Sequence, residues 1–260
     1  KTLIMLPPDP PGAVFTREMR CQEKKEVLGT AKPPLTPALL CAIFENQMLP
    51  FDLIENMPPD DAAAYLKNKN FVPDLIIFPT CTPTIARDME SAARLKTLTG
   101  AMTAAFGPHT SGIPRETLAE FPALDFAIIG EPEETCIELA QGETPFDSIR
   151  GIAFRNDAGN IVVNESRPGA KDLDALPVPA WERFNLSQYK VPLFGKKFLL
   201  IETARGCPYS CGFCVVPLTH GNSVREKSVP RIIEEMLLLR NKYGVDFFYL
   251  WADTAVLNKN

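Results

Sequence analysis

Short apolar runs alternate with longer amphipathic stretches through the first 145 residues of the chain. Strands that alternate with helices in this way predict a parallel, doubly wound α/β sheet. Five apolar runs have the length and composition of strands: Thr2–Leu6, Phe51–Glu55, Asp74–Phe78, Ala101–Phe106 and Asp125–Ile129. Five stretches with helical spacing lie between or after them: around Pro37–Gln47, Asp60–Lys69, Ile85–Thr97, Pro114–Glu120 and Glu133–Ala140.

Turn-forming residues follow most of these predicted strands. The loops in question are Pro7-Pro8, Pro79-Thr80, Gly107-Pro108 and Gly130-Glu131. Because the strands are expected to be parallel, their following loops share the carboxyl edge of the sheet. Open α/β sheets bind their ligands at that edge, so it is the first candidate binding surface.

The pattern changes after residue 145. Two apolar runs around Asn156–Asn160 predict a β-hairpin over residues 150–164, and a proline-containing connector with Trp181 follows it. A strand over Lys197–Glu202, a helix over Val229–Tyr243 and a strand over Asp246–Trp251 then predict the start of a parallel barrel or sheet. Two strands cannot close a barrel, so only its first part is expected here. The predicted units are residues 1–145, 146–195 and 196–260.

Composition places the chain among ordinary globular proteins. Of 260 residues, 45% are hydrophobic and 23% charged, and the net charge of −5 argues against a nucleic-acid surface. The apolar runs are too short to span a bilayer, and the beginning of the sequence lacks the features of a signal peptide. A cytoplasmic protein is therefore expected. In a reducing compartment the seven cysteines favour metal binding over disulfides.

Three of the seven cysteines, Cys207, Cys211 and Cys214, lie within eight residues, in a CxxxCxxC spacing directly after a predicted strand. Thiolates are the usual ligands of iron–sulfur clusters, which commonly take four of them. Three close cysteines without an evident fourth leave one iron open to bind and activate another molecule. The alternative is a structural zinc site that takes His220 as its fourth ligand.

This loop resembles the signature of the radical S-adenosylmethionine superfamily, including the aromatic Phe213 before the last cysteine. The resemblance implies a [4Fe-4S] cluster on the three cysteines, S-adenosylmethionine on the open iron, and the first part of a (βα)6 partial TIM barrel. In that family the backbone near the aromatic residue contacts adenine. Arg225 and Asp253 are further candidates for S-adenosylmethionine, with surface packing and a turn cap as their respective alternatives.

The domain before the loop resembles the cobalamin-binding domain of cobalamin-dependent radical S-adenosylmethionine enzymes, which has a flavodoxin- or Rossmann-like fold. The likeness rests on short turns after the strands and on the segments Arg17–Gln22 and Pro33-Pro34 before the first helix. The Asp-x-His-x-x-Gly motif of other cobalamin proteins is absent, so His109 is expected to be a loop residue and not a cobalt ligand. Threonines after the third strand could instead cap the next helix. The cobalamin candidates are Pro8, Thr80, Thr82, Gly107, His109, Gly130 and Glu131.

Together the resemblances imply a cobalamin-dependent radical enzyme that methylates or cyclises a small-molecule substrate at an unactivated carbon. A flavodoxin or ferredoxin would supply electrons, and this stretch of chain is expected to hold cofactors without completing a reaction alone. Two alternatives remain: a non-catalytic iron–sulfur or zinc protein with an α/β interaction module, and a tRNA methylthiotransferase. The latter class has extra cluster cysteines in its N-terminal domain, whereas the cysteines here are scattered: Cys21, Cys41, Cys81 and Cys136.

Overall fold

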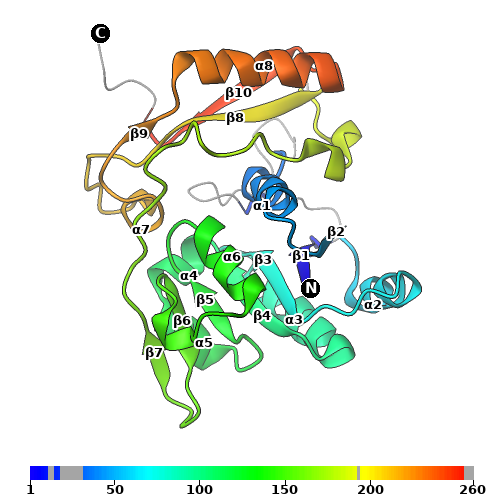
Figure 1. Cartoon of the computed structure of the whole chain (residues 1–260), viewed down its shortest axis with the longest axis vertical. Coiled ribbons are helices and arrows are strands. Elements are labelled where there is room, and N and C mark those ends of the chain that lie inside the picture. Colours follow the sequence, from blue (N-terminus) through cyan, green and yellow to red (C-terminus); the bar gives the residue numbers. More distant parts are fainter. Residues whose placement is uncertain (11–14, 18–31, 192–193, 255–260) are drawn as a thin grey trace.

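The computed structural model describes residues 1–10, 15–17, 32–191 and 194–254, and it contains two sheets (Figure 1). The larger sheet has the strand order β2-β1-β3-β4-β5-β6-β7, and its first five members run parallel. This order confirms the predicted doubly wound sheet, with its topological switch between β1 and β3. The five parallel strands are β1 (Thr2–Leu6), β2 (Phe51–Glu55), β3 (Leu75–Pro79), β4 (Met102–Phe106) and β5 (Phe126–Ile128).

Side chains on β1 alternate between the two faces of this sheet, as the pleat of a strand requires. Ile4 belongs to one buried cluster, whereas Leu3 and Met5 belong to the other. Both faces are therefore covered, which explains why the parallel strands read as continuous apolar runs. The covering helices are α1 (Leu35–Asn46) and α6 (Glu133–Gln141) on the first face, and α2 (Pro59–Asn68), α3 (Ile85–Thr99) and α5 (Pro114–Glu120) on the second.

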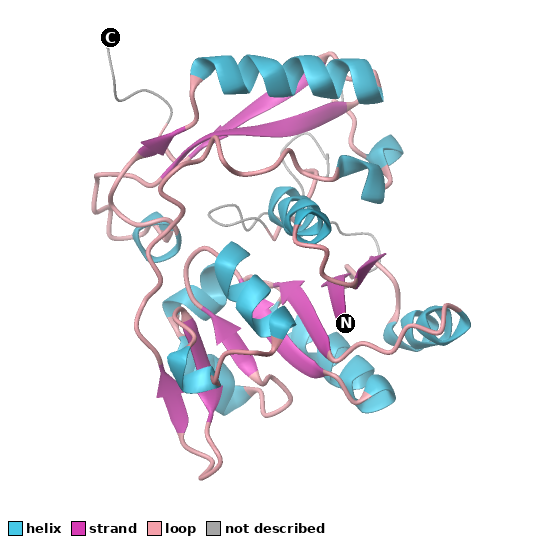
Figure 2. Cartoon of the chain, in the orientation of Figure 1, coloured by secondary structure: helices cyan, strands magenta, loops and turns pink. Residues whose placement is uncertain are grey.

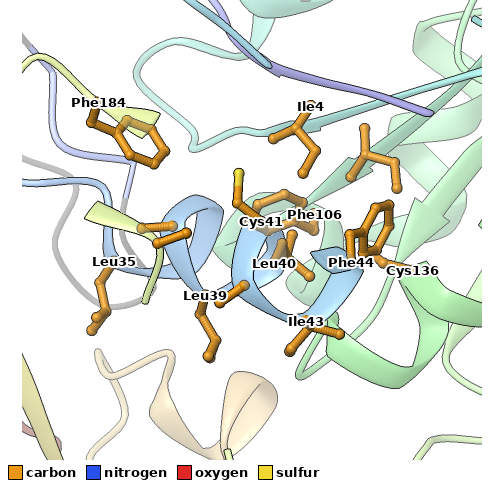
Figure 3. Close-up of a cluster of buried hydrophobic side chains, with 14 of the residues drawn as sticks. Ile4, Leu35, Leu39, Leu40, Cys41, Ile43, Phe44, Phe106, Cys136 and Phe184 are labelled. Carbon is orange, nitrogen blue, oxygen red and sulfur yellow. The ribbon is translucent and has the colours of Figure 1, made fainter. Parts of the chain in front are cut away.

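Helix α1 is buried along nearly its whole length, from Leu35 to Phe44. Figure 3 shows its apolar side chains reaching toward Ile4 and Phe106 of the large sheet and toward Phe184 of the connector. The same cluster continues into Leu200 of the second sheet. A helix that is apolar on every side belongs in the interior, and α1 lies between the two sheets in Figure 1.

The predicted hairpin forms, and it extends the large sheet. Strand β6 (Ile152–Arg155) pairs antiparallel with β5, and β7 (Ile161–Val163) pairs antiparallel with β6. The connector then packs against its neighbours as expected, because Trp181 is fully buried. Three short 3₁₀ turns lie in these segments: Phe146–Ser148, Trp181–Arg183 and Leu186–Gln188.

The second sheet has the order β10-β8-β9, with α8 (Val229–Tyr243) along it (Figure 2). Strand β8 (Phe198–Arg205) is parallel to β10 (Phe247–Ala252) and antiparallel to the short β9 (Arg225–Glu226). Strand β8 runs three residues further than predicted, because β9 pairs with its last two residues. Helix α8 matches its predicted range: the Ser228 hydroxyl caps its first turn, and Gly244 ends it with φ of 63°.

The sequence analysis did not predict two short helices, α4 (Pro108–Gly112) and α7 (Val216–Thr219). Each has a proline in its first turn and fewer than two full turns, which is too short for a recognisable period. None of the helices within the described residues has the length and hydrophobicity needed to cross a membrane.

Candidate functional site

The cysteine loop leaves the end of β8 and returns to β9 through α7. Its middle faces solvent: Cys211 is exposed, Cys207 and Cys214 are half-buried, and Phe213 is 91% exposed. Its two ends are joined, since the Cys207 amide donates to the Gly221 carbonyl at 3.2 Å. The loop is thus closed at its base and open at its tip.

Gly206 makes this closure possible. Its φ of +87° lies in the region that favours glycine, and a Cβ there would stand 2.2 Å from the carbonyl oxygen of Ser223. The outgoing and returning segments of the loop therefore cross at a point where there is no room for a side chain. The Gly206 amide donates to Oδ2 of Asp253 at 2.8 Å, which fixes the crossing to the end of β10.

Asp253 also pairs with His220, whose Nδ1 lies 2.5 Å from Oδ2. Both side chains are almost completely buried at the base of the loop. The zinc alternative requires His220 as a fourth ligand, and because Nδ1 is bonded to Asp253 only Nε2 would be left to bind the metal. Among the described residues there is no group of three or more His, Cys, Asp or Glu side chains placed around a single-ion position.

The donor set nevertheless fits an iron–sulfur cluster. Ligands of one tetrahedral zinc ion gather within about 4 Å of one another, given Zn–S bonds of about 2.3 Å. In a four-iron cluster each cysteine binds a different iron, so the sulfurs stand further apart. The structure places three cysteine thiols on one loop that is fixed at both ends, which is the ligand type and number expected for a cluster with one open iron.

A group of buried charges lies beside the loop and was missed by the sequence analysis. Arg205, the last residue of β8, donates Nη1 to Glu131 at 2.8 Å, Nη2 to Glu133 at 2.7 Å and Nε to Glu202 at 2.9 Å. Burial would lower the pKa of Arg205, but the three carboxylates raise it well above its usual value. The arginine directly before Gly206 was the available signal, since arginine is rarely buried unless paired.

Arg225, on β9, completes this group. Its Nη2 donates to Glu131 at 2.5 Å and to the His220 carbonyl at 2.7 Å, and its Nη1 donates to the Ala170 carbonyl at 2.7 Å. The structure thus brings together Arg225 and Glu131, which the sequence analysis assigned to different cofactors. Beside them lies a cavity of about 440 Å³, bounded by the loop after β5, the connector and the returning part of the cysteine loop.

The cobalamin candidates meet at the carboxyl edge of the large sheet, as expected for loops that follow parallel strands. Thr80 is fully buried and donates to Asp88 at 2.9 Å, whereas Thr82 is exposed and lies 3.1 Å from Nδ1 of His109. Gly107 crosses under the Thr80 carbonyl, where a Cβ would stand 2.2 Å from its oxygen. Pro8 and Gly130 are half-buried in the loops after β1 and β5.

Asp88 and Arg17 form a second buried ion pair at this edge. The Arg17 side chain donates to both oxygens of Asp88 at 2.9–3.1 Å and to Asp9 at 2.8 Å. Burial raises the pKa of Asp88, and Arg17 acts in the opposite direction. The remaining part of the predicted segment Arg17–Gln22 lies outside the described residues.

Three scattered cysteines are buried: Cys41 on α1, Cys81 after β3 and Cys136 on α6. Burial raises the pKa of the Cys41 thiol to about 12 and also raises the pKa of Cys81 and Cys136. These three thiols are enclosed and lie on three separate elements, unlike the open cysteine loop, so their arrangement does not support the second cluster that the methylthiotransferase alternative requires. Cys21 lies outside the described residues.

Comparison with known proteins finds no matching family model but several relatives. The chain is 31% identical over 242 residues to an uncharacterised methyltransferase of Pyrococcus horikoshii, covering 90% of the chain and 52% of that protein. It is 28% identical to the cytidylyl-2-hydroxyethylphosphonate methyltransferase of Streptomyces wedmorensis, covering 71% and 40%. It is 26% identical to the anaerobic magnesium-protoporphyrin IX monomethyl ester cyclase of Cereibacter sphaeroides, covering 87% and 38%. The chain spans about half the length of these relatives or less.

Two solved structures share the fold. The cobalamin-dependent S-adenosylmethionine radical enzyme OxsB, with aqua-cobalamin and S-adenosylmethionine bound, superposes with a TM-score of 0.73 at 17% identity, over 97% of this chain and 34% of that one. The radical S-adenosylmethionine methyltransferase TsrM of Kitasatospora setae, with cobalamin and a [4Fe-4S] cluster bound, gives 0.67 at 18% identity, over 97% and 49%. These likenesses confirm the fold that the resemblance implied. The chain is a relative of proteins named as methyltransferases and magnesium-protoporphyrin ester cyclases, and it has the α/β fold of cobalamin-dependent radical S-adenosylmethionine enzymes.

Proposed function

We propose that the chain is part of a cobalamin-dependent radical S-adenosylmethionine enzyme that methylates, or alternatively cyclises, a small molecule at an unactivated carbon. The observation that carries the proposal is the open cysteine loop at the end of β8, next to the carboxyl edge of a doubly wound sheet. Relatives named as methyltransferases and cyclases support both outcomes. Methylation is favoured because two of the three relatives described above carry that name.

Cys207, Cys211 and Cys214 would hold a [4Fe-4S] cluster, which when bound supplies the electron that cleaves S-adenosylmethionine. The chain's own part is to bind and orient. The exposed Phe213 offers its backbone and ring to the adenine, and the Asp253 carboxylate accepts a hydrogen bond from the methionine ammonium group. The Arg225 guanidinium already binds Glu131, so its role at the S-adenosylmethionine site is indirect. It orients the loop by donating a hydrogen bond to the His220 carbonyl.

The loops at the edge of the large sheet would bind cobalamin. The Nε2 atom of His109 is buried without a hydrogen-bond partner among the described residues. Burial lowers the pKa of His109, so the ring is neutral at pH 7 and can donate to an amide side chain of the corrin. Thr82 orients that ring through Nδ1. Backbone groups from the other loops complete the platform: Pro8, Thr80, Gly107, Gly130 and Glu131.

The predicted units remain part of the proposal. Residues 1–145 would form the cobalamin-binding domain, residues 146–195 the hairpin and connector, and residues 196–260 the first part of a (βα)6 barrel. A cytoplasmic location suits the unpaired thiols, which persist in a reducing compartment. A flavodoxin or ferredoxin would reduce the cluster.

The test is anaerobic incubation of the full-length protein with reconstituted cluster, cobalamin, S-adenosylmethionine and a reductant. The expected product is 5′-deoxyadenosine or S-adenosylhomocysteine, detected by mass spectrometry, and a Cys211→Ser variant should form neither. Failure of the wild-type protein to cleave S-adenosylmethionine would rule out the radical enzyme. Cleavage without cobalamin binding would remove only the cobalamin part of the proposal.

A further inference from the structure

The side chain of Glu131 joins segments that lie far apart in the sequence. Its Oε2 accepts from Arg205 at 2.8 Å and from the Ala170 amide at 2.9 Å, and its Oε1 accepts from Arg225 at 2.5 Å. Glu131 itself follows β5 of the large sheet, whereas the two arginines belong to β8 and β9 of the second sheet. One carboxylate therefore connects both sheets and the connector.

The two arginines stand on either side of the cysteine loop. Arg205 is two residues before Cys207, and Arg225 lies directly after the loop has returned. Their backbones pair across β8 and β9 in register, so Glu131 contacts both side chains from one position. The loop's closure and its attachment to the large sheet thus depend on the same group.

The surroundings leave Glu131 little freedom. Its side chain is 6% exposed, and a Cβ on Gly169 of the connector would stand 2.3 Å from its Oε1 and 2.4 Å from Nη1 of Arg225. The connector backbone therefore passes directly over the ion pair and shields it from solvent on that side. A charge-assisted hydrogen bond that is shielded in this way is stronger and more directional than one at the surface.

We propose that Glu131 is a positioning residue, whose carboxylate fixes the cysteine loop to the carboxyl edge of the large sheet and so sets the placement of the cluster relative to cobalamin. The inference rests on the proposed function for what the loop carries, but the attachment itself is a property of the chain. Neutral glutamine has nearly the same shape as glutamate and cannot form the same charge-assisted bonds. Its one acceptor oxygen could keep a neutral bond to only one of the two arginines, because Arg205 and Arg225 bind different oxygens of Glu131.

Hydrogen–deuterium exchange of the cofactor-free, full-length protein tests the attachment, in the wild type and in the Glu131→Gln variant. Loss of the charge-assisted hydrogen bonds weakens the attachment of the loop, so amides in the segment 206–225 should exchange at least about tenfold faster, which corresponds to about 1.4 kcal/mol. Strands β1, β3 and β4 should change by less than about twofold, because they open independently of the loop. The matched control is Glu134→Gln, three residues further on, whose exposed carboxylate pairs with Arg167; it should leave the loop unchanged.

A second readout is the electron paramagnetic resonance spectrum of the reduced, reconstituted protein. The Glu131→Gln variant should lose iron faster than wild type and show an altered signal with cobalamin present. Unchanged loop exchange would overturn the proposal. An equal increase in loop and sheet would also overturn it, because that result indicates general destabilisation.

If Glu131→Gln does not fold, Arg225→Gln removes the Arg225–Glu131 ion pair at the edge of the cavity and should give the same local effect. A wild-type protein that cleaves no S-adenosylmethionine would defeat the proposed function and leave the exchange result standing.

Discussion

Gly107 and Gly206 each allow two backbone segments to cross closely, in two different regions of the molecule. Each directly follows a parallel strand, each has a positive φ, and at each a Cβ would stand 2.2 Å from a crossing carbonyl oxygen. After β4 the crossing joins two neighbouring loops of the large sheet. After β8 it joins the two ends of a single loop, the one that carries the cysteines.

The two regions differ in what stabilises the rest of each loop. At the sheet edge, Thr80 and Thr84 donate to the buried Asp88, which also binds Arg17. In the cysteine loop, residues beyond the crossing have few side-chain partners, and Cys211 and Phe213 are exposed. The sheet edge is held by its own polar network. Within the part of the chain that the structure describes, the cysteine loop is held at its base, which leaves its tip available for a cofactor.

The largest expected effect comes from breaking the polar network at the sheet edge. Replacing Asp88 by alanine leaves Arg17 buried without its main partner, and disrupting a buried ion pair costs about 3–5 kcal/mol. Urea denaturation should show this loss as a lower midpoint. The control Asp60→Ala removes the exposed pair with Arg94 and should leave the midpoint unchanged. An Asp88→Ala variant as stable as wild type would contradict the role given to this network.

The glycine crossings should give the next largest effect. Gly107→Ala combines left-handed strain with overlap against a carbonyl, a cost of about 2–4 kcal/mol that should lower global stability. Gly206→Ala carries the same local cost, but it should appear as faster hydrogen exchange in the cysteine loop. Gly100→Ala is the control, since its φ is +78° and no atom lies within 4 Å of a Cβ there. It should cost about 1 kcal/mol from strain alone. Equal losses at all three positions would show that the crossings do not matter.

The sequence predicted the sheet well because its strands are buried on both faces and its helices are long enough to show a period. The cysteine loop was equally clear, since ligand spacing is local in the sequence. The buried ion networks were not predictable in the same way. Glu131 and Arg205 are 74 residues apart, and their pairing arises only when β8 is placed beside the loop after β5. The roles of Arg225 and His220 depend on the same long-range packing.

A smaller effect should separate the cysteines of the two regions. Cys81 at the sheet edge is buried, which raises the pKa of its thiol, whereas Cys211 is exposed. Each unit by which the pKa is raised lowers the thiolate fraction about tenfold at neutral pH. Iodoacetamide should therefore modify Cys211 at least about tenfold faster than Cys81 at pH 7.5. Because the pKa of Cys81 is raised, its labelling rate should increase at higher pH values than the labelling rate of an ordinary thiol does. Peptide mass spectrometry measures both rates. Similar modification rates for Cys81 and Cys211 would contradict the difference in burial and pKa between the two thiols.

The central claim is that the open cysteine loop holds a cluster with one iron free for S-adenosylmethionine. The most direct measurement is anaerobic reconstitution with iron and sulfide, followed by iron analysis and electron paramagnetic resonance of the reduced protein. We predict about four irons per chain, a signal that changes when S-adenosylmethionine is added, and loss of both in a Cys207→Ser, Cys211→Ser, Cys214→Ser variant. Zinc in place of iron, or a cluster signal that S-adenosylmethionine does not alter, would contradict the account.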